Sequence, residues 1–96
     1  MDATGLTVCV IFRILTEGLA AFHAYEDAVL PVLGDHDGKP RQRLRTANGL
    51  AEIHVIWFPS ATSFDAYRAG PRRVPHAPWL VASGASVALL NVSEIA

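Results

Sequence analysis

The dipeptide Asn48-Gly49 constrains the fold of this chain more than any other feature of its sequence. Both residue types tolerate positive φ, so the pair favours a two-residue turn that joins two antiparallel strands. The flanking residues predict strands over residues 41–47 and 50–58. The centre of the chain is therefore expected to form a β-hairpin.

The register of this hairpin brings charged residues of the two strands together. Arg43 is expected opposite His54, and Arg45 opposite Glu52 as a surface ion pair. The face that carries these residues also carries Arg41, Ile56 and Phe58. The opposite face is mostly apolar and suited to packing against another layer, with Gln42, Leu44, Thr46, Ile53, Val55 and Trp57.

The first third of the chain predicts one strand and one helix. Residues 6–15 form a nearly continuous apolar run, which is typical of a central strand with both faces covered. Apolar residues at helical spacing predict a helix over residues 17–33, capped by Thr16, kinked by Pro31 and ended by Gly34. A loop is expected to follow, up to Gly38.

The last third repeats this order. Ser60 is a suitable cap for a short helix that ends near Gly70, and Pro71, Pro75 and Pro78 allow only a turn after it. A last strand is expected over residues 85–92. The order strand, helix, strand, strand, helix, strand in 96 residues predicts a single α+β domain with a ferredoxin-like βαββαβ fold and a four-stranded antiparallel sheet.

Composition limits the partners of this domain. Hydrophobic residues make up 51% of the chain, more than so small a core can hold, so a homodimer or a small-molecule ligand is expected to cover the rest. A net charge of −1 provides no positive field for nucleic acid. The longest apolar run is too short to cross a membrane, and the single Cys9 excludes an intrachain disulfide, so we expect a cytoplasmic protein.

Several short segments resemble one family. The sequence is similar to the DUF1330-like branch of the dimeric α/β-barrel superfamily over nearly its whole length, in Ala24-Tyr25-Glu26, Val29-Leu30, His36-Asp37-Gly38, Phe58-Pro59-Ser60 and Tyr67. The resemblance implies a dimeric α/β barrel and no cofactor. More distant members include cofactor-free monooxygenases, isomerases and polyketide cyclases. In the cyclases a tyrosine and a histidine form an acid–base pair. Tyr67 matches that tyrosine, Arg73 stands at the histidine position, and His76 follows three residues later.

The candidate catalytic residues are His54, Tyr67 and Arg43. Arg43 beside His54 favours the neutral imidazole, which is the form that a general base needs, and an arginine with a histidine can stabilise a phenolate or enolate. A buried structural histidine and a core tyrosine are the competing interpretations of His54 and Tyr67. The sequence alone does not decide which sheet face lines a pocket.

Four further residues are candidates for substrate binding: Glu26, Trp57, Arg73 and His76. Glu26 falls on the apolar stripe of the first helix, either buried or at its rim. No metal site is expected, because the four histidines show no short metal-ligand spacing.

Two functions remain open at this point. One is a cofactor-independent enzyme, of cyclase, isomerase or monooxygenase type, that acts on an enolisable or phenolic metabolite. The other is a non-catalytic dimeric protein that binds a small molecule. A cavity with converging titratable groups favours the enzyme, and a purely apolar cavity favours the binding protein.

Overall fold

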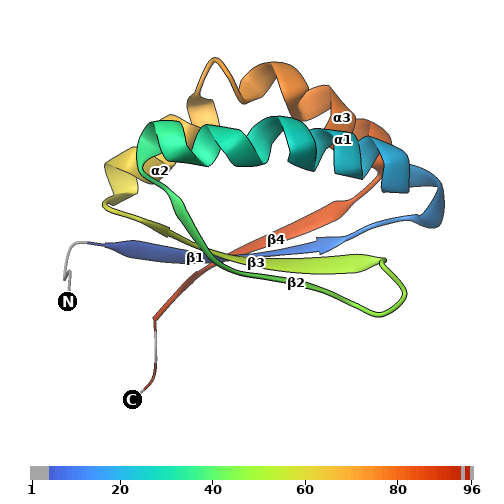
Figure 1. The fold of residues 1–96 in the computed structure, drawn as a ribbon, viewed down its shortest axis with the longest axis horizontal. Helices are drawn as coiled ribbons and strands as arrows, with labels where there is room; N and C mark the ends of the chain where they lie inside the picture. The colour runs from blue at the N-terminus through green and yellow to red at the C-terminus, as the bar shows by residue number, and fades with distance from the viewer. Residues whose placement is uncertain (1–4, 94, 96) are drawn as a thin grey trace.

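The computed structural model describes residues 5–93 and 95, and it has the expected α+β ferredoxin-like fold (Figure 1). Four antiparallel strands form one sheet in the order β2-β3-β1-β4. All helices cover one face of this sheet, and the other face is bare. The strands are β1 (Leu6–Arg13), β2 (Lys39–Arg45), β3 (Ala51–Phe58) and β4 (Ser86–Val92).

The helical layer is made of short segments. A 3₁₀ turn η1 (Thr16–Gly18) leads into α1 (Leu19–Val29), and a second 3₁₀ segment η2 (Leu30–His36) follows. The second half contributes α2 (Ala61–Ala69), η3 (Val74–His76) and α3 (Ala77–Ser83). No helix among the described residues is long and apolar enough to cross a membrane.

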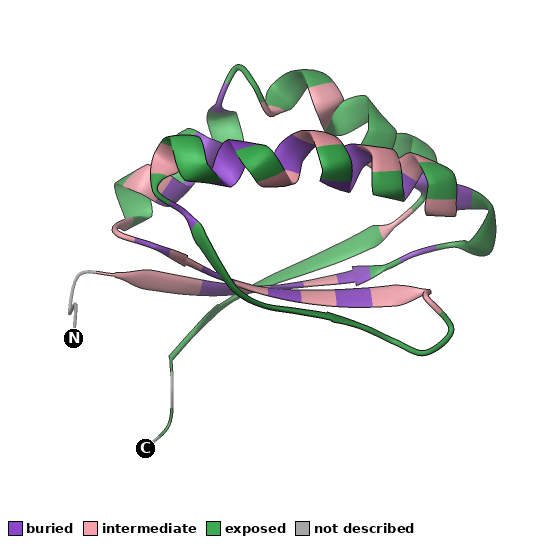
Figure 2. Cartoon of the chain, viewed as in Figure 1, coloured by how far each residue is buried: buried purple, intermediate pink, exposed green. Residues whose placement is uncertain are grey.

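Strict alternation along the two central strands sets the core. On β3 the even-numbered residues from Glu52 to Phe58 are buried under the helices, and the odd-numbered ones are half-buried on the bare face. Val8, Val10 and Phe12 of β1 are buried in the same way. Because Phe22 and Phe58 are fully enclosed, each contributes about 1.5–3 kcal/mol through burial. The continuous apolar run of β1 is thus covered on one face only (Figure 2).

The register of the central hairpin is confirmed, but its turn differs. Arg43 pairs with His54 and Arg45 with Glu52, as expected. The backbone N–H of Thr46 donates to the carbonyl of Ala51, so the loop between them has four residues and keeps the same register. Within this loop only Gly49 has positive φ, at 75°. The prediction of a two-residue turn was wrong. The Asn48 side chain instead accepts a hydrogen bond from Leu50 N–H and stabilises a wider loop.

A bulge displaces one residue of β2 from its expected face. The register shifts between Pro40 and Gln42, so that Arg41 is the extra residue. The guanidinium of Arg41 lies over the ring of Trp57, on the bare face, at 5.6 Å from the ring centroid. The expectation that Arg41 shares a face with Ile56 was therefore wrong.

The ends of the first helix also differ from expectation. Thr16 is not the N-cap, because it lies inside η1, whose preceding residue Leu15 has extended backbone. Pro31 lacks an N–H, and the chain tightens into the 3₁₀ segment η2 instead of stopping at Gly34. The left-handed residue Asp37, with φ of 59°, ends that segment. The expected loop before Gly38 is therefore mostly helical.

The second half follows the prediction more closely. Ser60 caps α2 by accepting a hydrogen bond from Ser63 N–H at 3.1 Å. The expectation of only a turn after α2 was wrong, because Pro75 and Pro78 lie in the first turns of η3 and the short helix α3, where the missing N–H costs nothing. Gly18 allows η1 to approach the end of α3 closely, because a Cβ there would overlap the carbonyl of Ser83. These contacts fix the helical layer above the sheet.

Candidate functional site

A cavity of about 320 Å³ lies between the helices and the sheet. It is lined by side chains of α1, α2, α3, η2 and three strands. Val87 and Leu89 of β4 belong to its wall and are 47% and 42% exposed, so the cavity opens along β4. Most of the wall is apolar, and the polar residues in it are Tyr25, Glu26, His54, Tyr67, Arg68 and Arg73. Its size is at the lower end of the range for small-molecule sites.

A buried acid–base cluster forms one part of the wall. Nε2 of His54 lies 2.9 Å from Oε1 of Glu52 and 3.1 Å from Oε2 of Glu26. His54 and Glu52 are two residues apart on β3, and Glu26 faces them from α1. All three are at most 4% exposed. Glu26 and His54 line the cavity, and Glu52 lies behind them.

Two half-exposed arginines of β2 close this cluster from outside. Arg45 binds Oε2 of Glu52 at 2.7 Å, and Arg43 lies 3.4 Å from Oε2 of Glu26. We expected the Arg43 guanidinium beside His54. It pairs with Glu26 instead, because a carboxylate attracts a guanidinium more strongly than an imidazole does. The inward position of Glu26 on α1 agrees with the buried alternative for this residue.

The carboxyl group of Glu52 is strongly perturbed. Burial by itself raises its pKa, because it penalises the charged form. Hydrogen bonds with Glu26, His54 and Arg45, and the charge of Arg45, outweigh burial and lower the pKa from 4.5 to about 2. Glu52 is therefore ionised at neutral pH and accepts the hydrogen bond from Nε2 of His54. This fixes the orientation of the imidazole.

The shift of Glu52 predicts a pH dependence of stability. Because the folded-state pKa is below 4.5, ionised Glu52 stabilises the fold above about pH 4.5, and this contribution is lost as the pH falls toward 2. A Glu52→Gln variant, followed by thermal unfolding between pH 6 and 2, should show a shallower fall in melting temperature than the unmodified protein. Asp65→Asn, at an exposed position of α2, is the control and should keep the full slope. Equal slopes for Glu52→Gln and the unmodified protein would contradict the assigned pKa.

Two tyrosines and one arginine form a second polar group in the cavity wall. Nη2 of Arg73 donates to the Tyr25 hydroxyl at 2.9 Å, and its guanidinium lies over the Tyr67 ring at 5.2 Å from the centroid. Arg73 also donates to the backbone carbonyl of Arg68 at 3.0 Å. Its Nε atom is buried and has no hydrogen-bond partner. Among residues 5–93 and 95, no carboxylate forms an ion pair with Arg73.

The Tyr67 hydroxyl remains protonated at neutral pH. Burial raises its pKa above the ordinary value of 10, and the nearby charge and hydrogen bond of Arg73 offset this only in part. Tyr67 packs against Phe58, with ring centroids 5.6 Å apart, which fixes its position. Since Arg73 is a donor only, the Tyr25 hydroxyl accepts from it, which leaves the tyrosine O–H groups of the cavity wall free to donate to a ligand. The group can therefore stabilise an oxyanion, and the unpaired arginine favours an anionic partner.

The expected site residues are divided between this cavity and other places. His54, Tyr67, Glu26 and Arg73 line the cavity. Arg43 reaches it only through Glu26. Trp57 lies on the bare face of the sheet, since neighbours in a strand point to opposite sides, and His76 of η3 does not line the cavity. The structure thus gives no support for substrate binding in this cavity by Trp57 or His76.

Three functional candidates were missed from the sequence. Glu52 was interpreted as half of a surface ion pair, although its alternation with His54 and Phe58 indicated the buried face. Tyr25 lies three residues after Phe22 on the buried stripe of α1, which was a usable signal. Arg68 offered no sequence signal that distinguishes it from a solvated helix residue.

Comparisons with known proteins support the fold. No protein-family model and no curated protein matches the chain, so the DUF1330 assignment is not confirmed. Among solved structures, SnoaB, a cofactor-independent oxygenase from Streptomyces nogalater, matches with a TM-score of 0.74 and 18% identity, over 97% of both chains. Rv0793 of Mycobacterium tuberculosis matches with a TM-score of 0.69 and 19% identity, over 97% of this chain and 99% of its own.

A third structure extends this set. A candidate antibiotic biosynthesis monooxygenase from Bacteroides thetaiotaomicron has a TM-score of 0.81 at 9% identity, and the match covers 100% of this chain and 94% of that one. At these identities the comparisons show a common fold. The residues of the cavity must carry any argument about function.

Proposed function

We propose that the protein is a small-molecule enzyme that moves protons on an enolisable or phenolic metabolite. One observation carries the proposal: a single cavity contains both an oriented imidazole and a pair of hydroxyl donors backed by an arginine. A purely apolar cavity would have favoured the non-catalytic binding protein. The fold gives general support to this proposal, because it is shared with SnoaB, a cofactor-independent oxygenase.

The proposed step is the removal of a proton from carbon next to a carbonyl group. Nε2 of His54 donates to Glu52, which leaves Nδ1 as the nitrogen that accepts the substrate proton. The electron pair of the broken C–H bond moves onto the carbonyl oxygen and forms an enolate. The hydroxyls of Tyr25 and Tyr67, polarised by Arg73, stabilise the oxygen charge. Return of the proton to carbon or oxygen completes an isomerisation or starts a cyclisation.

The apolar wall defines the rest of the substrate. Val8, Val29, Ile56, Phe64 and Leu80 line the cavity between its polar groups and have no polar side-chain atoms. Burial of an apolar ring or short chain of the substrate against them supplies binding energy that depends on the buried apolar area. The substrate class is therefore a compact, mostly apolar molecule with one oxygen that becomes negatively charged. All the groups that this step uses are side chains, so no cofactor is included in the proposal.

The assembly that we propose is a homodimer through the bare face of the sheet. That face carries the half-buried side chains of Ile11, Ile53, Val55 and Trp57 and the exposed Leu90. A second copy would cover this apolar surface and leave the cavity on the helical side of each sheet.

Proton exchange tests the proposed reaction without knowledge of the natural substrate. Ethyl 2-methylacetoacetate in D₂O is the probe, and loss of its C2 proton is followed by ¹H NMR. The unmodified protein should accelerate exchange, and Arg73→Met should lower the rate per protein by roughly 10²-fold or more, since it removes the group behind both hydroxyls. Arg72→Met is the matched control, because Arg72 pairs with Asp35 on the surface, and it should keep the full rate. No acceleration by the unmodified protein with this probe and with a panel of phenols and diketones would favour the binding protein instead.

A further inference from the structure

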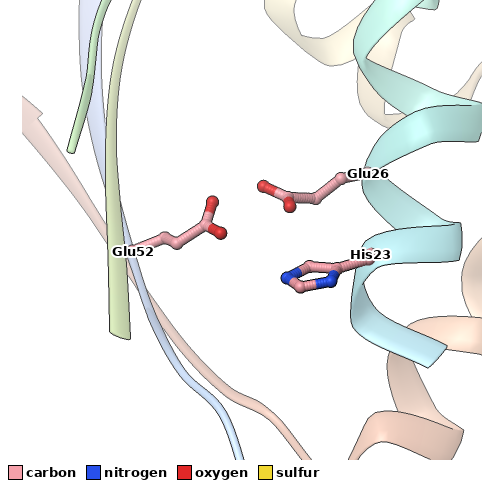
Figure 3. Close-up of side chains that lie close together, drawn as sticks. All are labelled: His23, Glu26 and Glu52. Atoms are coloured by element: carbon pink, nitrogen blue, oxygen red, sulfur yellow. The ribbon is translucent and has the colours of Figure 1, made fainter. Parts of the chain in front are cut away.

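A histidine of α1, His23, lies next to the acid–base cluster of Glu26, Glu52 and His54. Figure 3 shows the imidazole of His23 and the carboxyl groups of Glu26 and Glu52 pointing toward one another across the space between α1 and β3. One ligand atom from each residue lies within 4.8 Å of the others. His23 and Glu26 are three residues apart on α1, which places them on the same side of the helix.

The group of His23, Glu26 and Glu52 lies in largely buried surroundings. Both carboxylates are buried, and His23 is the more accessible member. Nε2 of His54 contacts both carboxylates at 2.9–3.1 Å and holds them in place beside α1. Arg43 and Arg45, which are half-exposed, contact these buried carboxyl groups from outside, with one arginine on each carboxyl group. A divalent ion would neutralise both at once and would connect the helix to the strand.

We infer that His23, Glu26 and Glu52 bind a divalent transition-metal ion. The donor set of imidazole nitrogen and carboxylate oxygen suits Zn²⁺ and its neighbours better than Ca²⁺ or Mg²⁺, which prefer oxygen alone. Bonds of about 2.1 Å require neighbouring ligand atoms about 3–3.5 Å apart, so the side chains must close in by rotation. His23 is free to do this because it is not buried.

The two arginines of β2 are the competing cations. Arg43 contacts Glu26 at the long distance of 3.4 Å and its side chain is 45% exposed, so it can be released into water. Arg45 holds Oε2 of Glu52, which leaves Oε1 to act as the ligand atom if His54 releases it. An arginine on the second oxygen is the kind of outer partner that orients a ligating carboxylate. This inference goes beyond the proposed function and does not rest on it.

Binding of Zn²⁺ to the full chain is the test. Dialysis against micromolar ZnCl₂ followed by metal analysis should give one Zn²⁺ per chain, and Zn²⁺ should raise the melting temperature in a concentration-dependent way. His23→Gln should weaken binding by roughly tenfold or more and remove the thermal shift. His36→Gln is the control, since His36 lies in η2 outside the group, and it should bind like the unmodified protein.

A cobalt spectrum identifies the ligands independently. Co²⁺ should give visible bands of a nitrogen–oxygen site without an intense thiolate band, because Cys9 lies on the opposite face of the sheet. No bound Zn²⁺, equal affinity in His23→Gln and His36→Gln, or a thiolate band would each overturn the inference. Circular dichroism of His23→Gln establishes that the variant is folded before its affinity is compared.

Discussion

A Val55→Glu variant is expected to be a monomer at micromolar concentration, whereas the unmodified chain should have twice its mass of 10.3 kDa. Val55 lies near the centre of the bare sheet face, between Cys9 of β1 and Gln42 of β2. In a monomer the new carboxylate would be in water. In the dimer it would be buried against an apolar surface without a partner, which costs several kcal/mol.

The size of this effect follows from the composition of the face. Leu44 and Leu90 are each 51% exposed in the single chain, and Ile11, Ile53 and Trp57 are half-buried beside them. An apolar surface of this kind on a small domain is typical of an interface. A loss of about 3 kcal/mol would weaken association by roughly a hundredfold.

Light scattering and sedimentation measure the change directly. Ala20→Glu is the control, because it adds the same charge at an exposed position of α1 on the helical side, and it should remain dimeric. If the unmodified chain is a clean monomer at micromolar concentration, the proposed assembly fails and only the fold remains. A dimeric Val55→Glu variant would place the interface elsewhere on the molecule.

The sheet could be predicted from the sequence because its signals are local and agree with one another. Alternation along β3, the Asn48-Gly49 pair and the position of the proline after Phe58 gave the strands and the register of the hairpin. The predicted turn type was wrong because the side chain of Asn48 accepts a hydrogen bond from Leu50 N–H. Residue propensities do not reveal which of two local hydrogen bonds forms. The bulge at Arg41 has no strong signal in the sequence either.

The candidate site was only partly predictable, because it depends on contacts between distant segments. The register of the hairpin placed Arg43 opposite His54, but the guanidinium of Arg43 contacts Glu26, seventeen residues earlier in the chain. The contact of Arg73 with Tyr25 joins positions 48 apart. Such pairs follow from how α1 and the segment after α2 lie over the sheet, which periodicity does not specify. The family resemblance gave a role to Tyr67 and placed Arg73 at the position of the family's histidine. It included Tyr25 in a matching segment without a role, and it did not include Glu52.

The catalytic assignment of His54 makes the sharpest prediction. A His54→Gln variant should lose the acceleration of proton exchange by roughly a hundredfold or more, which is the usual effect of losing a positioned base. The glutamine amide can still donate to Glu52 in place of Nε2, so the hydrogen bond between positions 52 and 54 of β3 is preserved. The melting temperature and the dimer should therefore change little. The probe is again ethyl 2-methylacetoacetate in D₂O, with exchange rates expressed per folded protein.

The competing interpretation of His54 predicts the opposite pair of results. If the imidazole only fills space beside Phe12, at 5.1 Å between ring centroids, and satisfies the two carboxylates, its replacement should lower stability by about 1–3 kcal/mol. Activity per folded molecule would then be unchanged. His36→Gln is the matched control for both measurements, because His36 lies outside the cavity wall. A destabilised His54→Gln variant with full exchange activity would remove His54 from the catalytic role and leave the Tyr25, Tyr67 and Arg73 group as a binding site for an anion.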